Sequence, residues 1–230
     1  HLGVSGFASH AVVDHRSVVR VDADVPADVA SLLGCAVLTG GGAVLNAARP
    51  EPGSSIGIVG LGGVGMAAVL VALGVPDVRV VAIDPVPEKR ALAERLGARA
   101  ATADELSDAG ERFATVVEAA GAIPALEAAV ALTAPGGRTV TVGLPHPDAR
   151  LSLSPTALVG EGRSLVGSYL GSAVPSRDIP RFVSWWREGR LPVEKLISSR
   201  IPLERLNEAM DELSEGRATR QIVEMPSLAG

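Results

Sequence analysis

The sequence predicts an α/β protein built on a doubly wound parallel sheet. Between residues 54 and 143, short β-branched runs alternate with longer helical ones, which is the pattern of βαβ units. The composition agrees, because 47% of the 230 residues are hydrophobic and only 20% are charged. A chain of this length and apolar content can bury a large core, which excludes intrinsic disorder.

The alternation assigns strands and helices in turn along this stretch. The expected strands are short apolar runs at residues 55–59, 78–83, 114–117 and 139–142. The expected helices lie between them and end at glycine or proline, at residues 63–73, 87–96 and 124–132. Residues 164–171 predict one further strand.

The flanking segments have a different pattern. Residues 11–13 and 17–21 indicate two strands with no helix between them, so we expect an antiparallel element there. Two apolar stripes at helical spacing predict amphipathic helices, formed by Ile179, Phe182, Val183 and Trp186, and by Leu206, Met210 and Leu213. A closing strand at residues 221–224 is expected to pair with the N-terminal strands.

Charge and cysteine content exclude some classes of protein. The formal net charge of −5 and the absence of a basic cluster argue against a nucleic-acid partner. The single cysteine, Cys35, can form no internal disulfide, and no leader segment follows His1, so we expect a cytoplasmic protein. Residues 56–75 carry no charge, but glycines divide them into a strand and a helix, so we expect no membrane span.

The strongest local motif is Gly-Leu-Gly-Gly-Val-Gly at residues 60–65, placed between an expected strand and an expected helix. Gly60 suits a tight turn, Gly62 lets a pyrophosphate approach the backbone, and Gly65 lets the helix pack closely on the strand. Gly63 and Val64 open the helix, whose free N–H groups and partial positive charge suit an anion. In this context the motif predicts a Rossmann-type, dinucleotide-binding sheet.

Asp84 follows the motif at the end of the second expected strand, 19 residues after Gly65. A carboxylate at this place accepts hydrogen bonds from the adenosine ribose hydroxyls and repels a 2′-phosphate, so NAD is favoured over NADP. The next residue is Pro85, not an arginine that could bind that phosphate. Lys89 either reaches the same ribose or is an ordinary exposed helix lysine.

Other candidate residues are ambiguous on the residues alone. Cys35 is either a small buried apolar residue or a metal ligand. Glu118 lies near the end of the third strand, where it is either a ligand contact or a cap on the following turn. None of the four histidines stands at a zinc-ligand spacing from another candidate ligand.

Taken together, these motifs resemble the medium-chain, zinc-dependent alcohol dehydrogenases. The matching segments run in order along nearly the whole chain: F-A-S-H-A-V-V at 7–13, G-C at 34–35, T-G at 39–40, the glycine motif, I-D at 83–84, P-G-G-R at 135–138, V-G-L at 142–144, G-S-Y at 167–169 and G-R-A-T-R at 216–220. The G-C and T-G pair and the terminal arginine segment are the more specific of these.

The resemblance implies roles for individual residues. Cys35 resembles the third ligand of the catalytic zinc, and Thr39 the residue that packs beside the nicotinamide. The other implied cofactor contacts are the nicotinamide wall Val142 and Leu144, a backbone contact at Leu170, the ribose pair Asp84 and Lys89, and the pyrophosphate contact Arg220.

The chain departs from the family pattern at its N-terminal side. The remaining catalytic ligands of the family, and its four-cysteine structural lobe, have no counterpart here. We therefore expect a fragment with three parts, namely a remnant of the β-rich catalytic domain (1–36), the cofactor domain (37–169) and a return segment of the catalytic domain (170–230). A smaller departure is the glycine run at 40–42, where the family has a helix and each interior glycine costs about 1 kcal/mol relative to alanine.

The implied activity is metal-assisted hydride transfer between an alcohol or aldehyde and NAD, in a homodimer or homotetramer. Two alternatives stay open. One is a zinc-free medium-chain reductase of the quinone or enoyl type, although such reductases usually prefer NADP. The other is a non-catalytic NAD-sensing domain, against which the segments on either side of the doubly wound unit argue.

Overall fold

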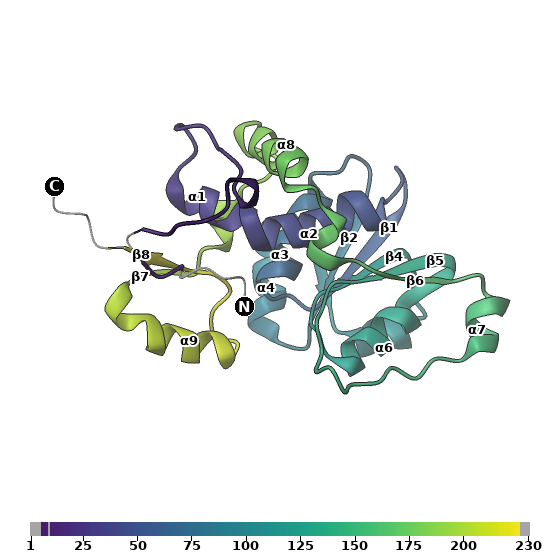
Figure 1. Cartoon of the computed structure of the whole chain (residues 1–230). Coiled ribbons are helices and arrows are strands. Elements are labelled where there is room, and N and C mark those ends of the chain that lie inside the picture. Colours follow the sequence, from purple (N-terminus) through teal and green to yellow (C-terminus); the bar gives the residue numbers. More distant parts are fainter. Residues whose placement is uncertain (1–5, 9, 226–230) are drawn as a thin grey trace.

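The computed structural model describes residues 6–8 and 10–225 (Figure 1). Its centre is a parallel sheet with the strand order β3-β2-β1-β4-β5-β6. The strands are β1 Ser55–Val59, β2 Arg79–Ile83, β3 Arg99–Ala101, β4 Phe113–Glu118, β5 Thr133–Thr141 and β6 Ser164–Gly167. The order reverses between β1 and β4, as in doubly wound folds, so the predicted fold class is confirmed.

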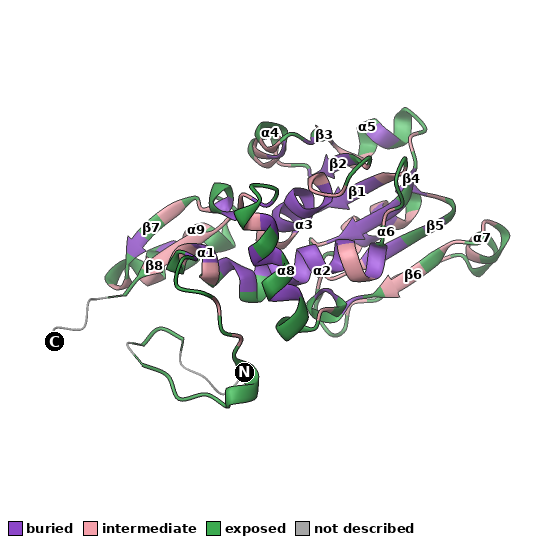
Figure 2. Cartoon of the chain, turned by 90° about the horizontal axis from the view of Figure 1, so that it is seen from above, coloured by how far each residue is buried: buried purple, intermediate pink, exposed green. Residues whose placement is uncertain are grey.

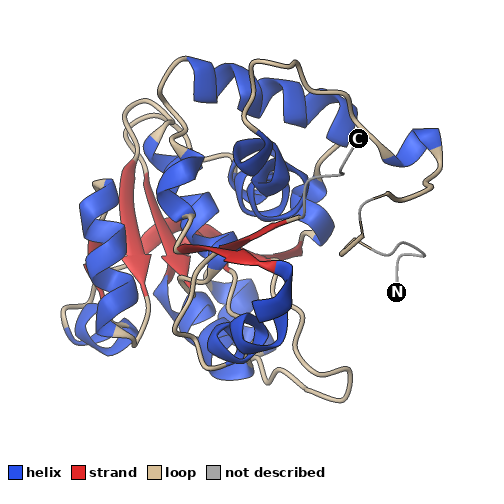
Figure 3. Ribbon diagram, turned by 90° about the vertical axis from the view of Figure 1, so that its left-hand side faces the viewer, coloured by secondary structure: helices blue, strands red, loops and turns tan. Residues whose placement is uncertain are grey.

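Helices cover both faces of this sheet (Figure 3). They are α3 Gly63–Leu73, α4 Pro87–Leu96, α5 Ala103–Asp108 and α6 Ile123–Leu132, with α7 Pro155–Gly160 before β6. Alternate strand residues serve two cores: Ile56 and Ile58 pack with α3, whereas Val59, with Val81 of β2, packs with α5 and α6. Burial on both faces explains why these strands read as continuous apolar runs.

A long helical segment that the apolar pattern did not reveal precedes the sheet. It runs through α1 Ala27–Leu32, the π-helical η2 Leu33–Val37, α2 Leu38–Gly42 and the π-helical η3 Ala43–Ala48. The helix Ala27–Ala48 is long and apolar enough to cross a membrane, with a mean hydropathy of 1.6, but 61% of its apolar 18-residue window is buried inside the protein. A core helix passes the same test, and α2 packs directly on α3.

The glycine run at residues 40–42 has a packing reason. A Cβ on Gly40 would collide with the Val64 carbonyl oxygen, and one on Gly41 would lie 2.8 Å from the Phe182 ring. A Cβ on Gly42 would lie 2.6 Å from the carbonyl oxygen of Gly171. The absence of side chains therefore lets this helix approach α3, α8 and the Gly171 turn, which offsets the poor helix propensity of glycine.

The C-terminal part comprises α8 Pro175–Arg187, the 3₁₀ turns η5 Val193–Leu196 and η6 Leu203–Arg205, β7 Ser199–Pro202, α9 Leu206–Ser214 and β8 Gln221–Glu224. Helix α8 forms where its apolar stripe predicts it, with Phe182 and Val183 buried, but Trp185 is buried in place of Trp186. Helix α9 also forms, although Met210 and Leu213 of its stripe are exposed.

The prediction of antiparallel strands in the N-terminal segment is wrong. Residues 11–13 and 18–21 have no regular structure, and a 3₁₀ turn, η1 His15–Ser17, lies between them. Val12 is fully exposed, because within the described part of the chain this segment has no neighbouring strand to pair with (Figure 2). The closing strand β8 pairs instead with β7, in parallel.

Three smaller expectations need adjustment. The strand expected at 164–171 ends at Gly167, because the chain then turns into the 3₁₀ stretch η4 Tyr169–Ser172. Strand β5 begins earlier than expected and includes the Pro135–Gly137 turn. Ser9, part of the family-like N-terminal segment, and His1 lie outside the described residues.

Candidate cofactor-binding site

The glycine loop joins β1 to α3 in a tight turn. Gly60 has a φ of +89°, and a Cβ there would lie 2.6 Å from Ala120. A Cβ on Gly65 would collide with the carbonyl oxygen of Gly60. Both positions therefore require glycine, and together they bring the helix N-terminus close to the end of β1.

Gly62 has a different environment. It is the N-cap of α3, with an ordinary φ of −76°, and a Cβ there would have no heavy atom within 4 Å. The N–H groups of the first helical turn, from Gly63 and Val64 onward, have no partner within the helix. The loop therefore presents hydrogen-bond donors and partial positive charge beside open space, which suits an anion.

Asp84 connects this loop to the end of β2. Its carboxylate is buried and accepts hydrogen bonds from the backbone N–H of Leu61 at 2.7 Å and of Val86 at 2.9 Å. Each carboxylate oxygen accepts one of these bonds and keeps lone-pair capacity for a ligand hydroxyl. Asp84 is thus held in a fixed orientation beside the glycine loop.

Lys89 and Arg90 follow Asp84 at the start of α4. Lys89 is half-buried, and its Nζ lies 3.8 Å from where a Cβ on Gly216 would stand, so the C-terminal segment approaches this end of the sheet. Arg90 donates to the carbonyl oxygens of Asp84 and Pro85, both at 2.8 Å. Sequence reasoning missed this contact of Arg90, which fixes the loop between β2 and α4.

Arg220 brings the C-terminal segment against the glycine loop. Its guanidinium lies where a Cβ on Gly63 would stand, so Gly63 makes room for it. The Arg220 Nε is buried and has no hydrogen-bond partner within the described part of the chain. A buried N–H without a partner is costly, and a phosphate oxygen would satisfy it. The loop, Asp84 and Arg220 together therefore fit an adenine dinucleotide with its pyrophosphate at the start of α3.

The residues predicted to face the nicotinamide follow β5 and β6. Val142 is half-buried and donates its N–H to the carbonyl oxygen of Glu118 at 2.9 Å, whereas Leu144 is 81% exposed. Leu170 stands in a left-handed turn, and Thr39 is buried in α2. A Cβ on Gly171 would lie 2.5 Å from the Thr39 carbonyl oxygen, so the structure brings the Leu170 turn against α2.

Glu118 acts as a cap on the turn after β4. Its buried carboxylate accepts the N–H groups of Ala120 and Gly121, both at 2.7 Å, and the hydroxyl of Thr141 at 2.6 Å. Of the two roles open to Glu118, these bonds favour the structural one.

A complete zinc site is not present in the described residues. Cys35 is exposed in η2, and no group of three His, Cys, Asp or Glu side chains in residues 6–8 and 10–225 is placed to hold a metal ion. His146 is exposed, and its Nδ1 accepts the N–H of Asp148 at 3.3 Å. Cys35 therefore stays a predicted ligand position, and the described donor set does not fit a catalytic zinc by itself.

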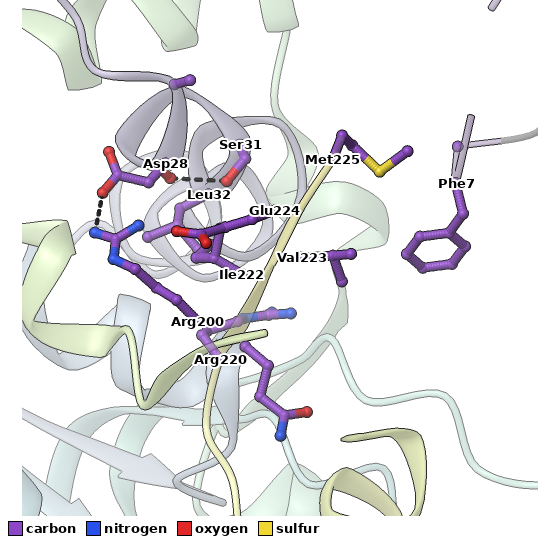
Figure 4. A pocket seen from close by; sticks show the side chains of 13 residues that line it. Phe7, Asp28, Ser31, Leu32, Arg200, Arg220, Ile222, Val223, Glu224 and Met225 are labelled. Carbon is purple, nitrogen blue, oxygen red and sulfur yellow. Dashed lines mark hydrogen bonds and ion pairs between the residues drawn. The ribbon is translucent and has the colours of Figure 1, made fainter. Parts of the chain in front are cut away.

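A cavity of about 680 Å³ lies beside Arg220, between α1, β7 and β8 (Figure 4). An ion pair between Asp28 and Arg200 crosses one side of it, and the hydrogen bond from Arg200 holds the pKa of Asp28 below its ordinary value. Phe7, from the N-terminal segment, lies across the cavity from α1 (Figure 4). Arg220 is the one predicted site residue in its wall.

Comparison with known proteins identifies the family. The family model described as zinc-binding dehydrogenase matches residues 63–188, more than half of the chain. Geraniol dehydrogenase of Castellaniella defragrans is 35% identical over 233 residues, which cover 96% of this chain and 62% of that protein. The chain thus belongs to the zinc-binding, medium-chain alcohol dehydrogenase family, and it spans about three fifths of the length of the curated relatives it matches.

Solved structures agree with this assignment. Benzyl alcohol dehydrogenase from Acinetobacter calcoaceticus superposes with a TM-score of 0.85 at 26% identity, covering 90% of this chain and 59% of that one. An alcohol dehydrogenase from E. coli CFT073, solved with NADH, has the same fold, with a TM-score of 0.76 at 21% identity, and the match covers 89% of this chain and 60% of that one. The family model describes zinc-binding dehydrogenases, so the proteins of this family are oxidoreductases.

Proposed function

We propose that this chain binds NAD and forms the cofactor-binding part of an alcohol dehydrogenase. The observation that carries the proposal is the cluster of three elements at one end of the sheet: the open glycine loop, the oriented Asp84 carboxylate and the unpartnered Arg220 Nε. Bound NAD supplies a nicotinamide that accepts hydride from an alcohol or returns it to an aldehyde. The chain's own residues bind and orient the cofactor.

In this proposal each site residue has a defined task. Asp84 and Lys89 hold the adenosine ribose, and Arg220 with the first turn of α3 holds the pyrophosphate. Val142, Leu144 and Leu170 line the nicotinamide end, and Thr39 packs beside it. Cys35 is one ligand of a zinc whose remaining ligands would come from outside the described residues.

The cofactor domain of the proposal is residues 37–169, between a catalytic-domain remnant at 1–36 and a return segment at 170–230. The whole protein would act on an alcohol or aldehyde in the cytoplasm. The alcohol or aldehyde substrate is supported by the relatives named above, whose printed names describe dehydrogenases of geraniol and benzyl alcohol. The domain bounds follow from the family resemblance of the sequence, and the cytoplasmic location from the single cysteine.

Cofactor selectivity tests the proposal. We expect NADH to bind more tightly than NADPH, because Asp84 would face the 2′-phosphate as a like charge, a contact that costs on the order of several kcal/mol. A fluorescence titration with each cofactor measures the preference. The matched variant Asp84→Asn keeps the side-chain volume and should narrow the difference. Equal affinities of the wild-type chain for the two cofactors would contradict the assignment of Asp84.

Self-association is expected through the edge of the sheet. Strand β6 is the terminal strand, with Leu165 and Val166 half-buried and Tyr169, just beyond it, 73% exposed. An edge strand offers unpaired backbone groups that a second copy can pair with across a twofold axis. Light scattering at micromolar concentration should give at least the mass of a dimer, whereas a monomeric mass would count against a homodimer or homotetramer.

A further inference from the structure

The turn at Tyr169–Ser172 has an unusual backbone. Leu170, Gly171 and Ser172 are consecutive residues in the left-handed region, with φ values of 47°, 70° and 50°. Residues with side chains rarely adopt this conformation, and such a turn persists only where its surroundings determine it. The contacts of this turn therefore show which groups hold it in this conformation.

Packing accounts for one side of the turn. A Cβ on Gly171 would lie 2.5 Å from the carbonyl oxygens of Leu38 and Thr39, so the turn meets α2 backbone to backbone. On its other side the hydroxyls of Ser168 and Ser172 share a hydrogen bond of 2.9 Å, which closes the turn. These contacts bring the turn close to α2, but neither of them is a hydrogen bond to the carbonyl oxygen of Gly171. Another group donates to that oxygen.

That group is the side chain of Asn46, in η3. Its Nδ2 donates to the carbonyl oxygen of Gly171 at 3.4 Å and to Oδ2 of Asp178 at 3.2 Å, while its Oδ1 accepts from Arg177 at 3.3 Å. An amide with a donor partner on one side and an acceptor partner on the other has one satisfied orientation. Asn46 therefore links the turn to the first residues of α8.

Asp178 supports Asn46 from within the protein. Its side chain is 2% exposed, and Oδ2 accepts the N–H of Val174 at 2.8 Å. Two nitrogens of Arg177 donate to this carboxylate, both at 2.8 Å, and they hold its pKa below the ordinary value. The buried carboxylate is therefore ionised at neutral pH and fixes the Asn46 amide by a charge-assisted hydrogen bond.

We propose that Asn46 and Asp178 are positioning residues for the nicotinamide end of the cofactor, acting through the Leu170 turn. The inference rests on the proposed function, in which the backbone at Leu170 contacts the carboxamide. The turn follows β6 at the carboxyl ends of the strands and touches α2 at Thr39, so it lies where ligands bind in this class of sheet. Within the described part of the chain, the hydrogen bonds described above for Asn46 and Asp178 involve neither the glycine loop nor Asp84.

The test compares two ligands that differ by the nicotinamide riboside. In the variant Asn46→Ala, the turn loses its hydrogen bond at Gly171, and NADH should bind about tenfold more weakly, the usual scale for a lost hydrogen bond linked to a charged group. ADP-ribose, which lacks the nicotinamide, should bind with an affinity within about twofold of the wild type. The fluorescence enhancement of bound NADH should also fall, because it reports the surroundings of the nicotinamide.

Two further variants complete the experiment. Asp178→Asn keeps the side-chain size but removes the charge that orients Asn46, so it should also weaken the binding of NADH. Glu111→Gln is the matched control, because Glu111 is also a mostly buried carboxylate paired with arginines, Arg79 and Arg99, but these lie on β2 and β3. It should leave both affinities unchanged.

The outcomes separate the two proposals. If the wild-type chain binds neither NADH nor ADP-ribose, the proposed function fails. If it binds both, and Asn46→Ala weakens them equally or leaves both unchanged, cofactor binding stands and the positioning role is overturned. Should Asp178→Asn fail to fold, the half-buried Asn46 still decides the result by itself.

Discussion

We expect the chain alone to oxidise no alcohol, even when NAD and zinc are both supplied. Cys35 is the one predicted ligand, and the described residues contain no group of three side chains that could hold a metal ion. A catalytic zinc takes three protein ligands and keeps one open position, which makes a bound alcohol acidic. Without that geometry the alcohol is not activated, and without a wall that excludes water from the nicotinamide the hydride transfer is not supported.

The assay uses primary, secondary and benzylic alcohols, with the absorbance of reduced cofactor as the signal. A full-length zinc-binding dehydrogenase assayed beside the chain shows that the conditions support turnover. Activity of this chain that disappears in Cys35→Ala would contradict the expectation. It would mean that ligands such as His10 or His146 complete a metal site that the described arrangement does not show.

The second large effect is expected at Gly65. Replacing it with alanine would place a Cβ against the carbonyl oxygen of Gly60, and both partners belong to the backbone. Overpacking of this kind costs about 1–3 kcal/mol, which corresponds to a fall in Tm of about 2–12 °C for a chain of this size. NADH affinity should fall as well, because the turn and the start of α3 must move apart. Thermal unfolding followed by circular dichroism measures the stability.

Gly62→Ala is the matched control for stability. The same Cβ at Gly62 meets no heavy atom within 4 Å and has an ordinary φ, so its Tm should stay within about 2 °C of the wild type. A large loss of stability in Gly62→Ala, or none in Gly65→Ala, would show that the loop has another geometry.

The central sheet could be predicted because each of its strands and helices is marked by residues within its own segment. The runs at β1, β2 and β4 are β-branched and buried on both faces, and glycine marks the ends of α3 and α4. The segment 27–48 was missed for the opposite reason. It is buried on most sides and carries glycines that disfavour a helix, so the polar stripe that reveals a surface helix is weak there.

The N-terminal strands show a further limit. Residues 11–13 and 17–21 have suitable side chains for strands, but a strand exists only when another strand pairs with it, and the described residues provide none. The same reason explains why β8 pairs with β7 and not with the N-terminal segment. The fold decides which strand lies beside β8, and the four residues Gln221–Glu224 do not encode that choice.

The residues of the candidate site also differ in whether the sequence could reveal them. The glycine loop and Asp84 follow from spacing within one βαβ unit, whereas Arg220 came only from the family resemblance, because it lies far from the loop in sequence. Asn46 and Asp178 were not found, since the two residues of the pair are 132 positions apart and neither belongs to a motif. Only the folded structure brings them to the Leu170 turn.

The most direct test of NAD binding at the glycine loop is a titration of the wild-type chain and Gly62→Ala with NADH. The open space at Gly62 is where the pyrophosphate is proposed to lie, so a methyl group there should weaken NADH binding by about tenfold or more while the Tm stays unchanged. This combination would place the cofactor on the loop. Saturable binding by the wild type that is equally tight in Gly62→Ala, or no binding by the folded wild-type chain, would contradict the account.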